Sequence, residues 1–178
     1  MKLKLLIPAF MIFLTAGCSI KYGETPVVED KVPEFVFNDA SMVRYENNKL
    51  MVEVEAESLE QYRNTSETYG KNVKFTAYNE DDGKVDTKGS CDYLFADADK
   101  ELYQLFDNIQ LVNYGEEMKV SANVLKWDGK TEQLTGSRGD SVIVEKEDTK
   151  IKGTGFSASG VSKSFSFRGN VNGNIETE

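Results

Sequence analysis

Apolar and polar residues alternate along most of the chain beyond residue 34. In one clear run, Leu50, Val52, Val54 and Ala56 lie on one face, and mostly glutamates lie on the other. Similar runs lie at 35–37, 73–78, 109–114, 118–124, 142–144 and 165–167. A period of two is typical of strands with one buried face. Turn-forming residues separate the runs at 47–48, 81–83, 128–129, 139–140 and 172–173, so the sequence predicts an all-β domain.

Small residues recur at a nearly constant spacing. They are Ala56, Ser90, Ala122 and Gly155, at separations of 34, 32 and 33 residues. A second strand is expected to begin near each of Val73, Ile109, Val142 and Val171. Helical arrays also repeat at about 34 residues, but the alternation here has the period of a strand. We expect about four strand pairs, stacked into an elongated twisted structure around one apolar interior. The register of the second unit stays open, because Asp86, Lys88 and Ser90 share a face there.

The first eighteen residues have the order of a bacterial lipoprotein signal. Lys2 and Lys4 precede an apolar run at 5–14, and Ala16-Gly17 leads directly into Cys18. The run is shorter than the ~20 apolar residues that span a bilayer, but it fits a signal peptide. We expect a signal peptide at 1–17, lipidation of Cys18, a proline-containing tether at 18–34 and a β-domain at 35–178. An ordinary secretory peptide with a chance cysteine is the alternative.

Charge and composition exclude several classes of function. The 178-residue chain has a formal charge of −9 and no histidine. Loss of Lys2 and Lys4 with the signal makes the charge −11, which argues against nucleic acid and against flat contact with anionic lipid. Without histidine there is no Ser-His-Asp or Cys-His catalysis and no histidine-containing zinc site. If Cys18 is acylated, Cys91 has no disulfide partner and is expected to be a small strand residue.

Three short motifs resemble functional sites but are better interpreted as turns. The Gly-Lys-Thr at 129–131 lacks the glycine that a phosphate loop needs five residues earlier, where Val124 stands. The acidic residues at 97, 99 and 101 resemble the start of a calcium loop, but Leu102 occupies the place of its glycine. The Arg-Gly-Asp at 138–140 falls where a hairpin turn is expected. We therefore expect no enzyme activity, no metal and no cofactor.

The order of strands and turns resembles a known family. The segments that carry this resemblance lie at 75–77, 89–93, 105–111, 118–128, 152–156 and 165–171. Together they are similar to the strand-and-turn alternation of lipopolysaccharide-export proteins. The last two resemble the closing segments of the LptC family, in which a Gly-x-Gly-apolar strand comes near the end of the domain. The resemblance covers roughly residues 33 to 172 and rests on order and spacing.

The resemblance implies an OstA/LptA-like β-jellyroll with an apolar groove along its length. It implies passage of lipopolysaccharide, or a related glycolipid, from an inner-membrane ABC transporter to an LptA-like periplasmic bridge of the same fold. The transporter's permease β-jellyroll domain and the bridge are the implied protein partners. The family usually anchors through a transmembrane helix, whereas this chain is expected to use a lipid. That places it at the periplasmic face of the inner membrane, with the outer membrane as the alternative because Ser19 follows the cysteine.

Acyl chains need shielding from water, since exposed apolar surface costs about 25 cal/mol per Å². The residues expected to line the groove are Val52, Val54, Phe75, Ile109, Leu111, Met118, Val120, Val142, Val144, Phe165 and Phe167. Unpaired edge strands at the two ends are expected to add a partner's strand by β-augmentation. The edge residues expected are Phe35, Phe37, Gly169, Val171 and Ile175.

A second hypothesis stays open on the same residues. An inward apolar side chain in a strand is more often plain core than ligand lining. A structural or surface lipoprotein whose β-domain binds protein has the same pattern, with a filled core and no bound lipid.

Overall fold

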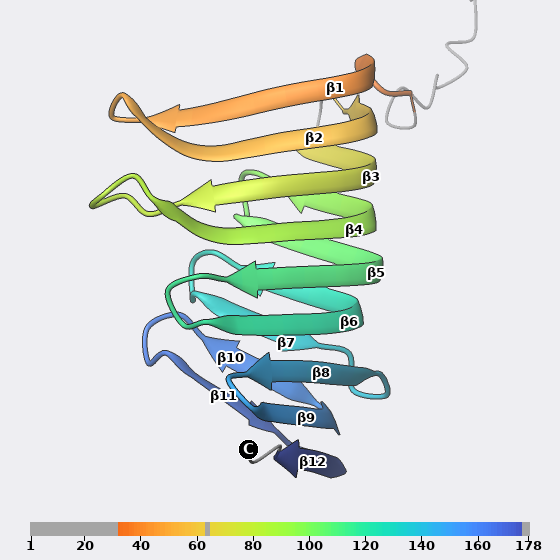
Figure 1. Ribbon diagram of the computed structural model, residues 1–178. Helices are drawn as coiled ribbons and strands as arrows, with labels where there is room; N and C mark the ends of the chain where they lie inside the picture. The colour runs from red at the N-terminus through yellow and green to blue at the C-terminus, as the bar shows by residue number, and fades with distance from the viewer. Residues whose placement is uncertain (1–31, 63–64, 176–178) are drawn as a thin grey trace, which may run out of the picture.

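In the described part of the chain, the regular secondary structure consists of β-strands. The computed structural model describes residues 32–62 and 65–175, which form one twisted sheet of twelve strands and contain no helix (Figure 1). The all-β prediction is therefore confirmed, with more strands than four pairs supply. The strands are β1 (Phe35–Glu46), β2 (Lys49–Gln61), β3 (Glu67–Tyr78), β4 (Val85–Asp97), β5 (Leu102–Asn113), β6 (Met118–Asp128), β7 (Gln133–Gly136), β8 (Ser141–Lys146), β9 (Thr149–Thr154), β10 (Phe156–Ser159), β11 (Ser164–Phe167) and β12 (Val171–Ile175).

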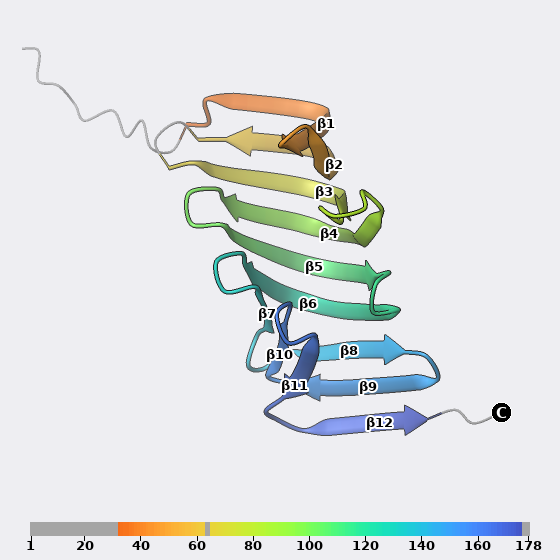
Figure 2. The ribbon, with the colours of Figure 1, turned by 90° about the vertical axis from the view of Figure 1, so that its left-hand side faces the viewer.

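The sheet is antiparallel and forks after its sixth strand. Strands β1 to β6 pair in chain order. The second half of β6 pairs with β7, and its first half pairs with β8. One branch continues through β10 to β11, and the other continues through β9 to β12. We call the first branch, β7 with β10 and β11, the A arm. Both views show these branches as two separate layers below β6 (Figures 1 and 2).

The fork arises because each long strand bends in the middle. Asp39, Asn72, Asp107 and Asn108 have φ between 49° and 59° near these bends. Non-glycine residues adopt this region rarely, and Asn and Asp adopt it most easily. The ladder between β4 and β5 breaks between Ser90 and Tyr93, at the same level. Three further bent strands are interrupted at the bend, so that each is divided into two short strands. These pairs are β7 with β8, β9 with β10, and β11 with β12.

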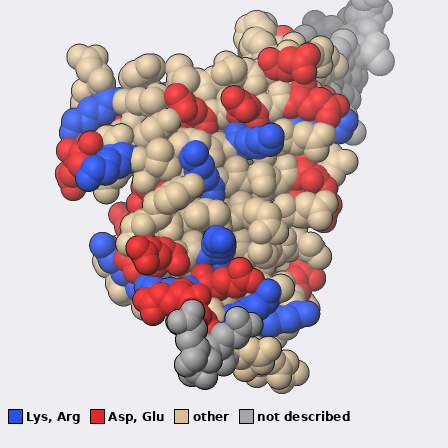
Figure 3. Space-filling view, in the orientation of Figure 1, with Lys and Arg blue, Asp and Glu red and all other residues tan. Residues whose placement is uncertain are grey.

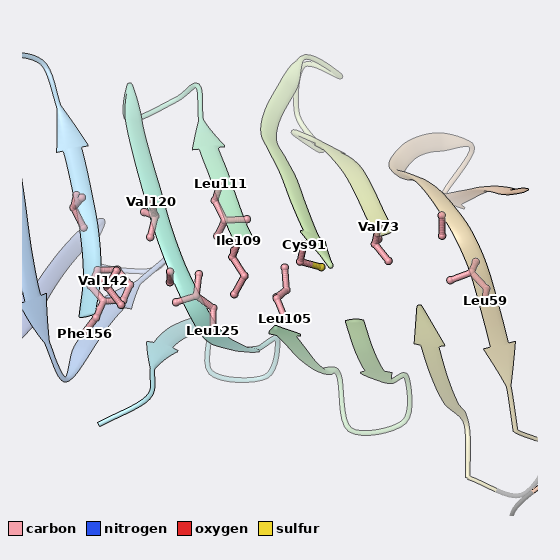
Figure 4. Close-up of a cluster of buried hydrophobic side chains, with 13 residues drawn as sticks. Leu59, Val73, Cys91, Leu105, Ile109, Leu111, Val120, Leu125, Val142 and Phe156 are labelled. Atoms are coloured by element: carbon pink, nitrogen blue, oxygen red, sulfur yellow. The ribbon is translucent and has the colours of Figure 1, made fainter. Parts of the chain in front are cut away.

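The bends divide the sheet into two walls that face each other. The A wall contains 35–38, 58–61, 67–71, 93–97, 102–106, 124–128 and the A arm. The B wall contains 40–46, 49–56, 73–78, 85–91, 109–113, 118–122 and β8, β9 and β12. Figure 2 looks between the walls from their open side, which we call the mouth. The buried side chains of both walls meet in one elongated core (Figure 4).

The bend shifts the predicted repeat. Inner residues flank the bend at a spacing of three, as in Ala56 with Leu59 and Ala122 with Leu125, and all four are buried. The matching pair in β4 is Cys91 with Leu94, so the expected repeat position Ser90 is wrong by one residue. In the last unit the pair begins at buried Gly153, and Gly155 lies at the break, with φ of 65°. One extra residue at each bend reverses the alternation, which is why a fixed period failed.

The turns lie largely where the sequence placed them. Residues 47–48, 81–83, 129–132 and 137–140 connect consecutive strands. The expected turn at 172–173 is wrong, because both residues lie inside β12 and pair with β9. Val73 and Ile109 do not begin strands but follow the bends of β3 and β5.

Glycine makes room for an aromatic ring on the inner face. Gly89 pairs with Phe75 across β3 and β4. A Cβ atom at Gly89 would lie 2.2 Å from Cζ of Phe75 and 2.7 Å from a Leu111 methyl carbon. The ring therefore occupies the volume that a side chain at position 89 would need.

We expect Gly89→Ala to lower the free energy of unfolding by about 1–3 kcal/mol, because the Phe75 ring must move and repack. Urea unfolding followed by circular dichroism measures the change. Gly139→Ala is the matched control: nothing lies within 4 Å of its Cβ position, so the change should stay within about 0.5 kcal/mol. Equal stability of the two variants would contradict the packing described for Phe75.

Candidate lipid-binding groove

The strand register aligns the inner side chains of the B wall in rows that run across the strands. The middle row is Met42, Val54, Phe75, Gly89, Leu111, Val120, Val144, Ile151 and Gly173. The row nearer the mouth is Arg44, Val52, Ala77, Thr87, Asn113, Met118, Lys146 and Thr149. The interior thus changes from apolar near the bend to partly polar at the mouth.

The A wall has a similar gradient. Its inner row near the bend includes Phe37, Leu59, Gly70, Leu94, Leu105 and Leu125. Its row nearer the mouth is Phe35, Gln61, Thr68, Ala96, Tyr103, Trp127, Leu134, Ala158 and Phe165. An elongated apolar interior with a partly polar mouth suits a ligand with an apolar body and a polar head.

The eleven predicted lining residues all belong to the inner face. Ile109, Leu111, Val120, Val142 and Val144 are buried in the core. Val54, Phe75, Met118, Phe165 and Phe167 are partly buried and pack against that core. Val52 is half-buried in the row nearer the mouth. The structure establishes their common face, and their contact with lipid stays a prediction.

Exposure falls along the groove from β1 to β8. In the middle row, Met42 is 50% exposed, whereas Val120 is 2% and Val144 is 1% exposed. Phe37 opposite, at 44%, is also open to water. The β1 end of the interior is therefore accessible, and the part between β5 and β9 is packed.

Three phenylalanines fill the interior at its other end. The ring centroids of Phe156 and Phe167 lie 5.5 Å apart, and those of Phe165 and Phe167 lie 6.1 Å apart. Gly153 of the B wall lies beneath this cluster, since a Cβ there would be 2.6 Å from Cδ1 of Phe167. Phe156 is the central residue that the sequence analysis missed. Its signal was the Gly-x-Gly-apolar segment at 153–156.

The sheet ends in a long edge at one side and two short edges at the other. β1 pairs only with β2, and its outward side chains Val36 and Val43 are more than half exposed. The predicted edge residues Phe35 and Phe37 begin this strand. At the far end, β12 carries Val171 and Ile175 and pairs only with β9. β11 is a second edge that the sequence analysis missed.

Gly169 does not belong to a strand. It lies in the connection between β11 and β12, where its N–H donates to the carbonyl of Thr154. The far edge therefore begins at Val171, two residues later than predicted.

Most charged groups lie on the outer faces and turns, and Arg44 and Lys146 lie in the inner row nearer the mouth. In the orientation of Figure 3, Lys, Arg, Asp and Glu are interspersed over the B wall. Glu57 accepts hydrogen bonds from Lys71 and Asn72, which lower the pKa of its carboxyl. Burial raises the pKa of the Cys91 thiol to about 11, so this inner cysteine is protonated at neutral pH. The ionised groups are thus kept to the outer faces, the turns and the mouth.

The rejected motifs form ordinary turns. Asp97 is buried and accepts hydrogen bonds from the backbone N–H and Nζ of Lys100, at 3.1 and 2.5 Å. These bonds lower the pKa of the Asp97 carboxyl, and the bond from Nζ has the largest effect. They also close the turn between β4 and β5. Residues 129–131 and 138–140 lie in the turns after β6 and β7. Across residues 32–62 and 65–175, no group of three or more acidic or cysteine side chains is placed to hold a metal ion.

Cys18 lies outside the described residues, so its lipidation stays a prediction. Within the described ranges, no helix has the length and apolar character needed to cross a membrane.

This chain is similar to a protein family, to a curated relative and to a solved structure. The model of a family described as "Lipopolysaccharide-assembly, LptC-related" matches residues 3–176. An uncharacterised protein of Treponema pallidum (strain Nichols) is 19% identical over 183 residues, covering 100% of this chain and 92% of the relative. Among solved structures, LptH, the LptA-homologous periplasmic component of the lipopolysaccharide transport device of Pseudomonas aeruginosa, matches with a TM-score of 0.34 and 8% identity. That match covers 84% of this chain and 99% of LptH.

Proposed function

Because this chain belongs to the LptC-related family of lipopolysaccharide-assembly proteins, we propose that its interior carries the acyl chains of lipopolysaccharide or a related glycolipid. The family supports a periplasmic transport component. The observation that carries the finer proposal is the inner face, which is apolar from one edge of the sheet to the other and open to water at β1.

The open end explains how a lipid could enter without unfolding the core. Phe37, Met42 and Phe75 offer apolar surface beside β1, and the polar groups of Arg44 and Gln61 lie nearer the mouth. Acyl chains can contact the first three while the saccharide stays in water. A chain moved from a bilayer to this surface changes its environment little, so the transfer is nearly neutral in free energy. Direction must come from an ATP-driven partner.

The hand-over is proposed to occur at the sheet edges. An ABC transporter's periplasmic β-jellyroll domain and an LptA-like bridge would each extend the sheet, one at β1 and one at β11 and β12. β-augmentation of this kind satisfies the unpaired backbone groups of an edge strand and continues the inner face into the partner. The chain is proposed to be held by lipidated Cys18 at the periplasmic face of the inner membrane.

We expect a photo-crosslinking amino acid at Phe75 to capture lipopolysaccharide in cells, because this side chain is half-buried on the inner face near the open end. The same amino acid at Lys74, on the outer face of β3, is the matched control and should capture none. Gel mobility and mass spectrometry identify the adducts. Capture of lipid at neither position, beside normal protein levels, would favour a structural lipoprotein with a filled core.

Photo-crosslinkers at Tyr45 in β1 and Asn174 in β12 should capture two different proteins, each containing a related β-domain. Lys88 of β4 is the control, since its strand is already paired on both sides and should capture neither protein. Mass spectrometry of the adducts identifies the partners. The edge proposal is wrong if Lys88 captures the same proteins as the two edge positions.

Cys18→Ser should move the protein from the membrane fraction to the soluble periplasmic fraction, because the variant cannot carry acyl chains. Each CH₂ that such chains bury in the bilayer contributes ~0.8 kcal/mol to membrane binding. Fractionation and immunoblotting measure the change, with Cys91→Ser as the control that keeps the anchor. A C18S variant that stays in the membrane fraction after its signal peptide has been removed would show that the lipid is not the anchor.

A further inference from the structure

The A arm is the most weakly paired part of the sheet. β7 pairs with β6 over four residue pairs, β10 with β7 over three, and β11 with β10 over four. By comparison, the ladder between β1 and β2 contains eleven pairs. Short ladders open at lower free energy than long ones, so this arm is the part of the sheet expected to open first.

The tip of the A arm reaches across the mouth to the opposite wall. Glu116 lies in the turn between β5 and β6, at the edge of the B wall. One of its carboxylate oxygens lies 3.3 Å from Nζ of Lys146 at the end of β8. The other lies 4.0 Å from Nζ of Lys163, in the turn between β10 and β11. Glu116 thus accepts a hydrogen bond from one lysine of the B wall and lies at ion-pair distance from one lysine of the arm.

The arm also borders a cavity of mixed polarity. This open cavity of about 210 Å³ lies between Phe165 of the arm and the residues of β8, β9 and their turn. Its lining consists of Val144, Lys146, Glu147, Thr149, Ile151 and Phe165. Beside it, Phe156, Phe165 and Phe167 occupy the interior that would connect the groove with the β12 edge. A lipid moving from β1 towards β12 would meet these rings.

We propose that the A arm is a gate at the exit of the groove, and that Glu116 is its latch. In the closed state the arm fills the exit with aromatic rings, and Glu116 separates two lysines that would otherwise repel each other. Movement of the arm withdraws the rings and joins the cavity to the groove. This inference rests on the proposed lipid transport, but the movement itself can be tested without lipid.

The first test is hydrogen exchange of the full chain in detergent, measured by mass spectrometry. Glu116→Gln should raise exchange in β10 and β11 about two- to fivefold, the effect of losing exposed ion pairs, and leave β2 to β5 unchanged. In the wild type, salt at about 1 M should also raise exchange in β10 and β11, because it screens charges beyond about 3 Å. In E116Q the same salt should raise exchange little further.

Glu145→Gln is the matched control, because it removes an ion pair of 2.6 Å with Lys150 on the outer face of the same wall. E145Q should leave β10 and β11 unchanged. Unchanged exchange in E116Q, or an equal rise in both variants, would overturn the latch.

The second test connects the gate with lipid. Photo-crosslinkers at Phe75, near the open end, and at Ile151, beneath the arm, are compared in wild type and in E116Q. Lipopolysaccharide capture at Ile151, relative to Phe75, should rise severalfold in E116Q. No capture at Phe75 would overturn the proposed function, while the exchange result would still decide the gate. Capture at Phe75 with an unchanged ratio would overturn the gate alone.

Discussion

The structure depends on one constraint: a single sheet with one apolar face has to bury that face against itself. In the described part of the chain there is no helix and no second sheet to cover it. Domains normally solve this with two packed layers. Here each long strand supplies both layers by bending, and backbone pairing continues on either side of the bend. Small residues such as Ala56, Cys91 and Ala122 lie beside the bend and let the two walls approach.

The size of the inner side chains then decides where the interior is core and where it is groove. In the middle of the sheet, leucine, isoleucine and valine from both walls fill the space between them. At two places where an aromatic ring lies inside, a glycine on a neighbouring or opposite strand makes room: Gly89 for Phe75 and Gly153 for Phe167. At β1 no further strand supplies a neighbour, so the same kind of side chain becomes accessible surface. A single fold thus contains a packed core and a binding surface made from one continuous face.

Much of this arrangement follows from the alternation of residue types. The period of two identified the strands and correctly grouped all eleven inner residues, because a buried face selects apolar side chains at every second position. It could not locate the bends, since one extra residue there reverses the alternation. A signal was nevertheless present: Asn72 and Asp107-Asn108 stand in the middle of strands, where their residue types are unfavourable. The fork could not be predicted, because strands of four residues carry too little pattern to show that β6 has two partners on one side.

The direction of the strands has a further consequence for assembly. β1 runs from the A wall to the B wall. Successive bent strands alternate in direction, and there are nine of them, six whole and three interrupted. The ninth, formed by β11 and β12, therefore also runs from the A wall to the B wall. An identical copy stacked in the same orientation would therefore meet this chain through a parallel ladder. Parallel pairing is slightly less stable per residue than antiparallel pairing. A partner whose first strand runs in the opposite sense across the two walls would form the antiparallel ladder, so strand polarity alone favours a different protein over a second copy at this junction.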